Sequence, residues 1–251
     1  MTATAPWLVP DWSAPARVRA VVTTRLVPGA SQPPFAAFNL GAHCGDDPAA
    51  VVANRAALVA RLHLPSAPHW LRQVHGSDVA VFDQPARSGD DPAVADAAAT
   101  RVPGVVLCVL TADCLPVLVC ADDGSEIAAI HAGWRGLAAG VIERCVERMQ
   151  TPVERLMFWL GPAIGPGSYE VGAEVRDAFT GANAAAAATF VPTRPGHWHC
   201  DLYALARQRL ATLGARRIVG GGFDTLGDPC FYSHRGQQPT GRFASLIWID
   251  R

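Results

Sequence analysis

Apolar positions along the chain fall into short strand-sized runs that alternate with amphipathic segments of helical length. Alternating or continuous apolar runs rich in β-branched residues predict strands, and a 3.6-residue apolar period predicts helices. The expected strands are Arg17–Thr24, Trp70–Val74, Val79–Phe82, Gly104–Leu110, Leu115–Cys120, Glu126–His131, Arg155–Leu160, Arg217–Val219 and Leu246–Ile249. The expected helices start at Pro48 after an acidic cap, and cover Gly133–Met149, about Glu174–Phe179, and Leu202–Leu213 after Asp201.

The order of these elements predicts the fold class. Strands and helices are interleaved, and the turn Asp122-Asp123-Gly124 makes at least one neighbouring strand pair an antiparallel hairpin. We therefore expect an α/β (α+β) fold in which mixed β-sheets are sandwiched by helices, rather than a doubly wound parallel sheet. At 251 residues, half of them hydrophobic and with no linker-like stretch, the chain is expected to form a single domain over residues 1–251.

Three segments are predicted to be loops, and one is ambiguous. Pro28–Gly45 is rich in Pro, Gly and Ser, and loops of that length are usually functional or disordered. Arg87–Pro92 and Gly161–Gly167 are also expected to be loops. Ala182–Ala188 is nearly all alanine and is expected to be a helix end or an irregular loop without an assigned function.

Composition excludes several classes of function. The net charge is -1, from 21 basic and 22 acidic residues, which does not suit a duplex-binding protein. The sequence shows no basic amphipathic helix of the kind that binds a membrane surface, and its apolar runs are too short to span a bilayer. The start of the chain lacks the pattern of a signal peptide. The seven cysteines are irregularly spaced, so we expect free thiols and a cytoplasmic location.

Three residues stand out as candidate metal ligands: His75, Cys114 and His131. Each lies at the end of an apolar strand beside a small residue, and zinc prefers imidazole nitrogen and thiolate sulfur. A catalytic zinc site commonly has three protein ligands and one open position. Taken singly, however, such a cysteine is more often a small core residue, and such a histidine an ordinary polar group. Spacing alone leaves both interpretations open, and the His-x-Glu and Cys-x-x-Cys pattern of nucleobase deaminases is absent.

Several sequence blocks together resemble one known family. The most specific is His131-Ala132-Gly133-Trp134-Arg135-Gly136, and the others are Gln73-Val74-His75-Gly76, Thr111-Ala112-Asp113-Cys114-Leu115-Pro116, Phe38-Asn39-Leu40-Gly41, Leu160-Gly161-Pro162-Ala163, Tyr169-Glu170-Val171-Gly172, Phe231-Tyr232-Ser233-His234-Arg235 and Thr240-Gly241-Arg242. Together, and in their order along the chain, these blocks resemble the YfiH-like family, also called laccase-domain, polyphenol oxidase or purine nucleoside phosphorylase. Phe223-Asp224 departs from that pattern, since relatives often carry a Cys-Thr pair there.

The resemblance implies both a cofactor and an activity. It implies that His75, Cys114 and His131 bind one Zn²⁺. It also implies phosphorolysis of adenosine, inosine, guanosine and methylthioadenosine to the free base and (methylthio)ribose 1-phosphate, together with adenosine deamination. An older description of the family is a copper-dependent polyphenol oxidase. Cu²⁺ suits this chain less well, because only two of its eight histidines fall in the matched metal blocks.

Phosphorolysis requires a site for the phosphate anion, for which arginine is suited. Arg55, Arg72 and Arg135 are the candidates, and Arg135 lies at the start of an expected helix. Asn39 is expected to orient ribose or phosphate from the long loop.

The expected catalytic group is Cys114, Asp113 and Arg72, with Asp113 moving protons or orienting a histidine. Expected partners are a purine nucleoside and phosphate, with no nucleic acid, no membrane and a monomeric chain. Two alternatives stay open. One is a hydrolase of an amide or cell-wall precursor with Cys114 as nucleophile. The other is a module that only recognises nucleosides.

Overall fold

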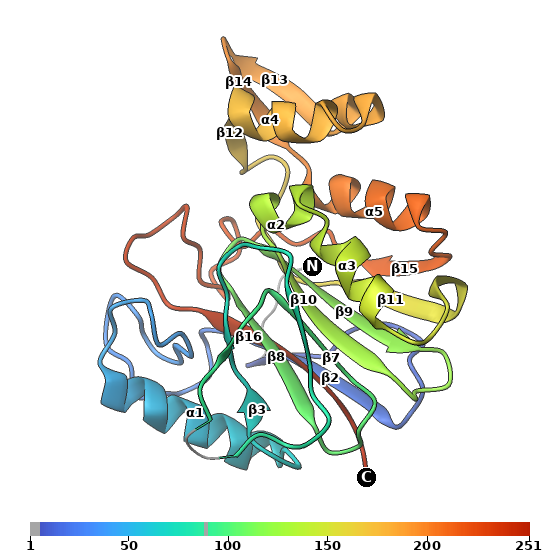
Figure 1. Cartoon of the computed structure of the whole chain (residues 1–251). Helices are drawn as coiled ribbons and strands as arrows, with labels where there is room; N and C mark the ends of the chain where they lie inside the picture. Colours follow the sequence, from blue (N-terminus) through green and yellow to red (C-terminus); the bar gives the residue numbers. More distant parts are fainter. Residues whose placement is uncertain (1–5, 88–89) are drawn as a thin grey trace.

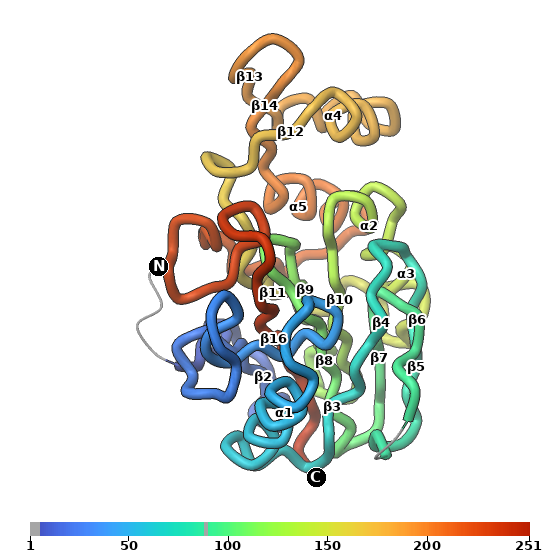
Figure 2. Tube along the Cα trace, turned by 90° about the vertical axis from the view of Figure 1, so that its left-hand side faces the viewer, coloured from blue at the N-terminus to red at the C-terminus, as the bar shows by residue number. Residues whose placement is uncertain are grey.

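Two mixed β-sheets pack face to face, and helices cover both outer faces of the pair (Figures 1 and 2). The computed structural model describes residues 6–87 and 90–251. The first five residues lie outside the described part, as do two residues of the expected loop Arg87–Pro92. This arrangement confirms the expected class of mixed sheets sandwiched by helices.

The five-stranded sheet has the order β1-β2-β16-β8-β3. Its strands are β1 (Trp7–Leu8), β2 (Val18–Thr23), β3 (Pro68–His69), β8 (Val106–Thr111) and β16 (Phe243–Ile249). Only the β3–β8 pair is parallel, and the other three pairs are antiparallel. The last strand of the chain therefore lies in the middle of this sheet, where all seven of its residues are buried.

The six-stranded sheet has the order β15-β11-β9-β10-β7-β5. Its strands are β5 (Val79–Val81), β7 (Ala97–Thr100), β9 (Leu115–Ala121), β10 (Ile127–Ala132), β11 (Leu156–Leu160) and β15 (Arg217–Gly220). The expected hairpin at Asp122-Asp123-Gly124 joins β9 to β10, and Gly124 adopts the left-handed φ of 71° that this turn requires. The two edge pairs, β11–β15 and β5–β7, are parallel, so this sheet is also mixed.

The core consists of three apolar layers: one between the two sheets and one on the outer face of each sheet. The inner faces meet in a cluster that contains Leu107 and Ile247 from one sheet and Leu118 and Trp159 from the other. Helix α1 (Pro48–Leu62) packs Leu58 on the outer face of the five-stranded sheet. Helices α2 (Trp134–Ala138), α3 (Val141–Arg148) and α5 (Leu202–Thr212) cover the outer face of the six-stranded sheet.

A small lobe stands above the sandwich in Figure 1. It consists of a three-stranded sheet, β12-β14-β13, together with helix α4 and the 3-10 helix η2. The bounds are β12 (Glu170–Gly172), β13 (Phe190–Arg194), β14 (His197–Cys200), α4 (Ala173–Thr180) and η2 (Ala184–Thr189). The remaining short elements are the parallel pair β4 (Leu71–Arg72) and β6 (Ala93–Val94) and the 3-10 helix η1 (Val153–Arg155).

The structure differs from the sequence expectations at several places. The helix expected over Gly133–Met149 is divided in two, because Gly140 adopts a left-handed φ of 86° between α2 and α3. The strand expected over Trp70–Val74 is replaced by β3 and β4, which belong to different sheets. Strands β1, β6, β7, β12, β13 and β14 were not expected. Within residues 6–87 and 90–251, no helix is both long and apolar enough to cross a membrane.

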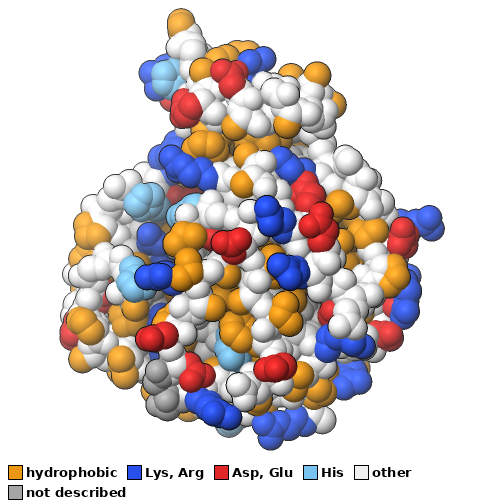
Figure 3. All heavy atoms as spheres, viewed as in Figure 1, with side chains coloured by type: hydrophobic (Ala, Val, Ile, Leu, Met, Phe, Trp, Pro, Cys, Tyr) orange, Lys and Arg blue, Asp and Glu red, His pale blue; other side chains and the backbone are white. Residues whose placement is uncertain are grey.

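Figure 3 shows that acidic and basic side chains are interspersed over one face of the molecule. No continuous basic surface is visible on that face. This pattern agrees with the near-neutral net charge.

Candidate metal centre

The fold brings the three predicted metal ligands together from three separate segments. His75 lies in the loop between β4 and β5, Cys114 lies in the short connection from β8 to β9, and His131 lies on β10. Their ligand atoms all lie within 4.8 Å of one another, and the Cys114 Sγ is 3.8 Å from the His75 Nε2. The two imidazole rings meet nearly at right angles, with an interplanar angle of 75°.

These separations suit a zinc ion. Zinc–sulfur and zinc–nitrogen bonds of about 2.3 and 2.0 Å at a tetrahedral angle place the two ligand atoms about 3.5 Å apart. The observed separation of 3.8 Å between Cys114 Sγ and His75 Nε2 is close to that value. Three donors of the N, N, S type leave the fourth position of a tetrahedral ion open, as in catalytic zinc sites. In the part of the chain that the structure describes, this is the one His, Cys and acidic group of three or more with such geometry.

A buried carboxylate, Asp96, holds two of the ligands in place. Its Oδ1 accepts a hydrogen bond from the His131 Nδ1 at 2.8 Å and from the His75 backbone N–H at 2.9 Å. Its Oδ2 accepts from the backbone N–H groups of Val74 and Gly76. Because Asp96 engages Nδ1, the Nε2 of His131 is the nitrogen left to face the metal.

The cluster is electrostatically coupled. Burial alone raises the pKa of the Cys114 thiol, but the charge of His131 and hydrogen bonds from both imidazoles outweigh it and lower the pKa to about 6. Burial opposes the charged form of His131, whereas the Cys114 thiolate and Asp96 raise the pKa of His131. A thiolate is therefore favoured at this position, and the thiolate is the form that binds metals.

The backbone is in an unusual conformation at two positions of the site. His75 and Asp113 have left-handed φ angles of 59° and 87°, which non-glycine residues rarely adopt. The Asp113 carboxylate accepts hydrogen bonds from the Thr225 hydroxyl and the Arg235 backbone N–H, both at 2.6 Å. Asp113 thus fastens the segment after β15 to the connection that carries Cys114. The sequence suggested that Asp113 orients a histidine. In the structure, Asp96 makes that hydrogen bond to His131 instead.

A cavity of about 350 Å³ opens beside the metal ligands. All three ligands line it, and its wall continues over the segment from Gly41 to Cys44, over Arg55 and Trp70, and over His234 and Arg242. Of the described residues that line this cavity, none is acidic. The cavity therefore carries positive charge with no facing carboxylate to balance it.

The sequence candidates for phosphate and substrate divide into two groups. Arg55 lines the cavity, whereas Arg72 and Arg135 are exposed and are not part of its wall. Arg135 stacks on its neighbour Trp134. Asn39 is fully buried behind the wall, where its Oδ1 accepts hydrogen bonds from the backbone N–H groups of Gly41 and Arg242.

Asn39 therefore shapes the cavity from behind. It fixes the loop that ends at Gly41 and the start of the segment that enters β16, two regions far apart in the sequence. Figure 2 shows these regions side by side, the early loop in blue and the late loop in red. The Leu40 backbone N–H also donates to the Arg242 carbonyl at 3.1 Å, which confirms that the two segments pair directly.

Three residues of the site were not singled out from the sequence: Asp96, His234 and Arg242. The signal for Asp96 was a single acid inside the apolar run Ala93–Ala99, because a charge in such a run must find a partner when it is buried. His234 and Arg242 lie in irregular segments, and only the fold shows that they reach the cavity.

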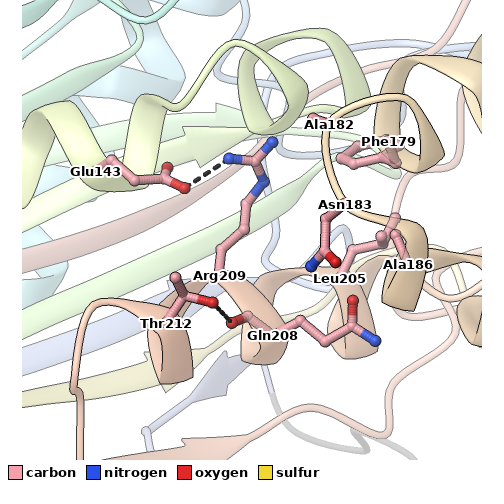
Figure 4. Close-up of a pocket in the computed structure, with 9 residues that line it drawn as sticks. All are labelled: Glu143, Phe179, Ala182, Asn183, Ala186, Leu205, Gln208, Arg209 and Thr212. Carbon is pink, nitrogen blue, oxygen red and sulfur yellow. Dashed lines mark hydrogen bonds and ion pairs between the residues drawn. The ribbon is translucent and has the colours of Figure 1, made fainter.

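A second cavity, of about 160 Å³, lies between α3, α5 and the lobe (Figure 4). Its one arginine, Arg209, pairs with Glu143 at 2.5 Å and donates to the Ala138 carbonyl. Phe179 and Leu205 supply apolar wall. The charges of this cavity are thus paired with each other, in contrast to those of the cavity beside the metal ligands.

Comparison with known proteins identifies the family. Residues 19–250 match the family model described as multi-copper polyphenol oxidoreductase laccase. The chain belongs to this laccase-like family. The match covers nearly the whole sequence, so the family resemblance noted from the sequence blocks is confirmed.

Relatives of this laccase-like chain carry the name purine nucleoside phosphorylase. A Pseudomonas aeruginosa protein of that name is 53% identical, over 97% of this chain and 98% of its own. The Escherichia coli protein named purine nucleoside phosphorylase YfiH is 48% identical, over 96% of this chain and 98% of its own. A Neisseria meningitidis crystal structure of a DUF152 protein superposes with a TM-score of 0.93 at 41% identity, over 98% and 100% of the two chains.

Proposed function

We propose that this chain is a zinc-dependent purine nucleoside phosphorylase whose metal is bound by His75, Cys114 and His131. Its substrates would be adenosine, inosine, guanosine and methylthioadenosine, and its products the free base and (methylthio)ribose 1-phosphate. The observation that supports this most is the ligand cluster, which opens onto a positively charged cavity without facing carboxylates. The names of the relatives support a nucleoside and phosphate as the substrates.

The cavity fits this reaction in size and charge. A volume of about 350 Å³ falls within the range of small-molecule sites. Trp70 offers an aromatic surface in the wall, and arginine is the side chain best suited to hold a phosphate dianion. Positive charge that already faces the position of the anion needs no rearrangement as the reaction proceeds, which is how such sites lower barriers.

When bound, zinc supplies a Lewis acid that polarises a coordinated oxygen or nitrogen atom and activates water. The chain's own residues then have distinct tasks. Asp96 fixes the tautomer and orientation of His131 and the loop of His75. Asp113 holds the connection that carries Cys114 against the Arg235 segment. Arg55 and the cavity wall bind and orient the substrates.

Adenosine deamination is a second candidate activity of the same site, because activated water beside a bound purine is what attack at C6 requires. It needs no phosphate and yields inosine, so its product separates it from phosphorolysis. The phenol-oxidase alternative is less well supported by the donor set. The laccase reaction relies on several copper ions, whereas the described residues contain a single His and Cys cluster.

We also propose that the chain works as a monomer in the cytoplasm. All seven cysteines are free thiols, which suits a reducing compartment.

The test is an assay of metal-quantified protein with adenosine, in the presence and absence of phosphate. We expect phosphate-dependent adenine, about one zinc per chain, and loss of both zinc and adenine formation in Cys114→Ala. Cys200→Ala is the matched control, since Cys200 is a buried thiol in the lobe. A covalent substrate adduct on Cys114, without bound zinc, would instead support the amide-hydrolase alternative. Binding without release of any base would support a recognition module.

A further inference from the structure

Two arginines converge on one end of the cavity. Arg55 from α1 and Arg242 from the segment before β16 both line the cavity, and both guanidinium groups lie within electrostatic range of the Cys44 thiol. The chain packs tightly here: a Cβ on Gly41 would lie 2.5 Å from the Cys44 Sγ and 2.8 Å from the Arg242 Cγ. Arg242 is therefore built into a close-packed wall, and both arginines are partly buried.

Each guanidinium is held by backbone carbonyls, which leaves other nitrogens free. The Arg55 Nε and Nη2 both donate to the Leu40 carbonyl, at 3.0 and 2.8 Å, and the guanidinium stacks on Trp70 at 3.9 Å. The Arg242 Nη1 donates to the Thr240 and Gly241 carbonyls at 2.9 Å. The Arg55 Nη1 and the Arg242 Nε and Nη2 make no hydrogen bond to the described residues.

Neither arginine forms a salt bridge within the part of the chain that the structure describes, although the surface arginines Arg155 and Arg194 do. Two partly buried guanidinium groups that face the same space repel each other unless an anion lies between them. Free N–H groups with fixed positions are the arrangement that binds a phosphate or carboxylate with several hydrogen bonds. Asp46 is the carboxylate within electrostatic range of Cys44, but it does not line the cavity, and its Oδ2 already accepts hydrogen bonds from Ser31 and Asn39. The free N–H groups of the two arginines are therefore available to an anion from solution.

His234 connects this end to the metal ligands. It lines the cavity, and it lies within electrostatic range of both Arg242 and His75. An anion held by the arginines would therefore be in the same cavity as a purine nucleoside bound beside the metal, with His234 in the wall that joins them.

We propose that Arg242, together with Arg55, forms the phosphate-binding end of the cavity. This assignment rests on the proposed phosphorylase function and gives a role to Arg242, which the sequence motifs contain but to which they assign none. The ligand is inorganic phosphate, and the same chemistry could also recognise the 5′-phosphoryl group of a nucleotide. Arg72 and Arg135, the other two sequence candidates, lie outside the cavity wall and play no part in this site.

The first experiment compares Arg242→Gln and Arg242→Lys in the zinc-loaded full chain. Phosphate binding is measured by calorimetry, and KM is measured separately for phosphate and for adenosine. In Arg242→Gln we expect phosphate binding to weaken and its KM to rise by about 10- to 100-fold, with the adenosine KM within about twofold. Arg242→Lys should recover part of the loss. Arg176→Gln is the control for the loss of an arginine outside the cavity, since Arg176 lies on α4 in the lobe, where it contacts Trp198.

A second pair of variants keeps the test valid if Arg242→Gln does not fold. Cys44→Asp places a carboxylate in the same wall, within electrostatic range of both guanidinium groups, and should abolish phosphate binding, whereas Cys44→Ser should keep it. Unchanged phosphate binding in both Arg242→Gln and Cys44→Asp would overturn the proposal. Weaker binding of adenosine monophosphate with unchanged phosphate binding would also overturn it, in favour of a nucleotide.

The outcomes also separate this proposal from the proposed function. If the wild-type chain binds phosphate through Arg242 but releases no purine base, the phosphate site stands and the phosphorylase proposal fails. If phosphorolysis is observed and Arg242→Gln leaves the phosphate KM unchanged, the phosphorylase proposal stands and the phosphate site at Arg242 fails.

Discussion

At the scale of single residues, the site depends on one carboxylate that performs two tasks. Asp96 is fully buried and accepts hydrogen bonds from an imidazole and from three consecutive backbone N–H groups. Burial alone raises the pKa of Asp96, but these donors outweigh it and lower the pKa. The charge is compensated by donors that belong to the site itself, so the orientation of His131 and the position of His75 are set together.

Asp96→Asn is expected to weaken zinc binding by about 10- to 100-fold, because partners that orient a ligand histidine typically contribute that much to metal affinity. The amide nitrogen cannot accept a hydrogen bond, so at least one of the donors loses its partner and the unfolding temperature should also fall. Competition with a chromogenic chelator measures the affinity. Asp123→Asn is the control, since Asp123 is an exposed acid paired with Arg155. Zinc affinity within twofold of the wild type would contradict this role of Asp96.

The residue types of the cluster were predictable, whereas its supporting residues were not. His75, Cys114 and His131 stand out because each follows or ends an apolar strand beside a small residue. Arg242 and His234 lie in matched blocks but at no expected strand end, and their positions in the cavity wall depend on contacts between segments about 200 residues apart, such as Asn39 with Arg242. Tertiary contacts of this length have no local pattern in a sequence.

At the scale of elements, two loops beside the site are tied together by Asp224. Its carboxylate accepts hydrogen bonds from the Gly165 N–H, the Ser168 hydroxyl and the Leu226 N–H. The preceding residue, Phe223, packs edge-on against Trp159 in the core between the sheets. The Phe223-Asp224 pair thus has a structural role in this chain.

Asp224→Asn should lower stability in a way that depends on pH. Burial raises the pKa of Asp224, but its hydrogen-bond donors outweigh burial and lower it below the value in the unfolded chain. A carboxylate with a lowered folded pKa stabilises the fold fully above its unfolded pKa, and this stabilisation disappears as the pH falls through the folded pKa. Urea unfolding at pH 7 and at pH 3 should therefore show a larger difference between wild type and variant at pH 7. An equal difference at both pH values would argue against this role of the carboxylate.

Capping residues correctly predicted where two helices begin, whereas a helix break at a glycine and two strands of the lobe were not predicted. Asp47 and Asp201 cap α1 and α5 through hydrogen bonds to Ala49 and Ala204, as expected from acidic residues at those positions. The break at Gly140 was missed because a glycine inside an amphipathic pattern does not by itself show that it will adopt a left-handed conformation. The lobe strands β13 and β14 were missed because β13 is mostly exposed and β14 is mostly half-buried with two histidines among its four residues, so neither shows the apolar alternation of a core strand.

At the scale of the whole molecule, the metal ligands lie on strands and connections that the apolar cores already hold together. Cys114 lies where the chain passes from β8 in one sheet to β9 in the other, and His131 lies on β10 beside β9. The cores between and outside the sheets contain large apolar clusters that include none of the three ligands. The fold is therefore not organised around the metal in the way that a small zinc domain is.

Removal of zinc with a chelator should consequently lower the unfolding temperature without unfolding the protein. A ligand present at about 100 times its Kd stabilises the folded state by about 2.7 kcal/mol, which for a chain of this size corresponds to a shift of roughly 5–10 °C. Circular dichroism at 25 °C should be unchanged by chelation, and a thermal scan should show the shift and its reversal when zinc is restored. Cys114→Ser protein should show no response to zinc in the same scan, because it lacks the thiolate ligand. Loss of secondary structure on chelation at 25 °C would show instead that the sheets depend on the metal, contrary to the independent cores.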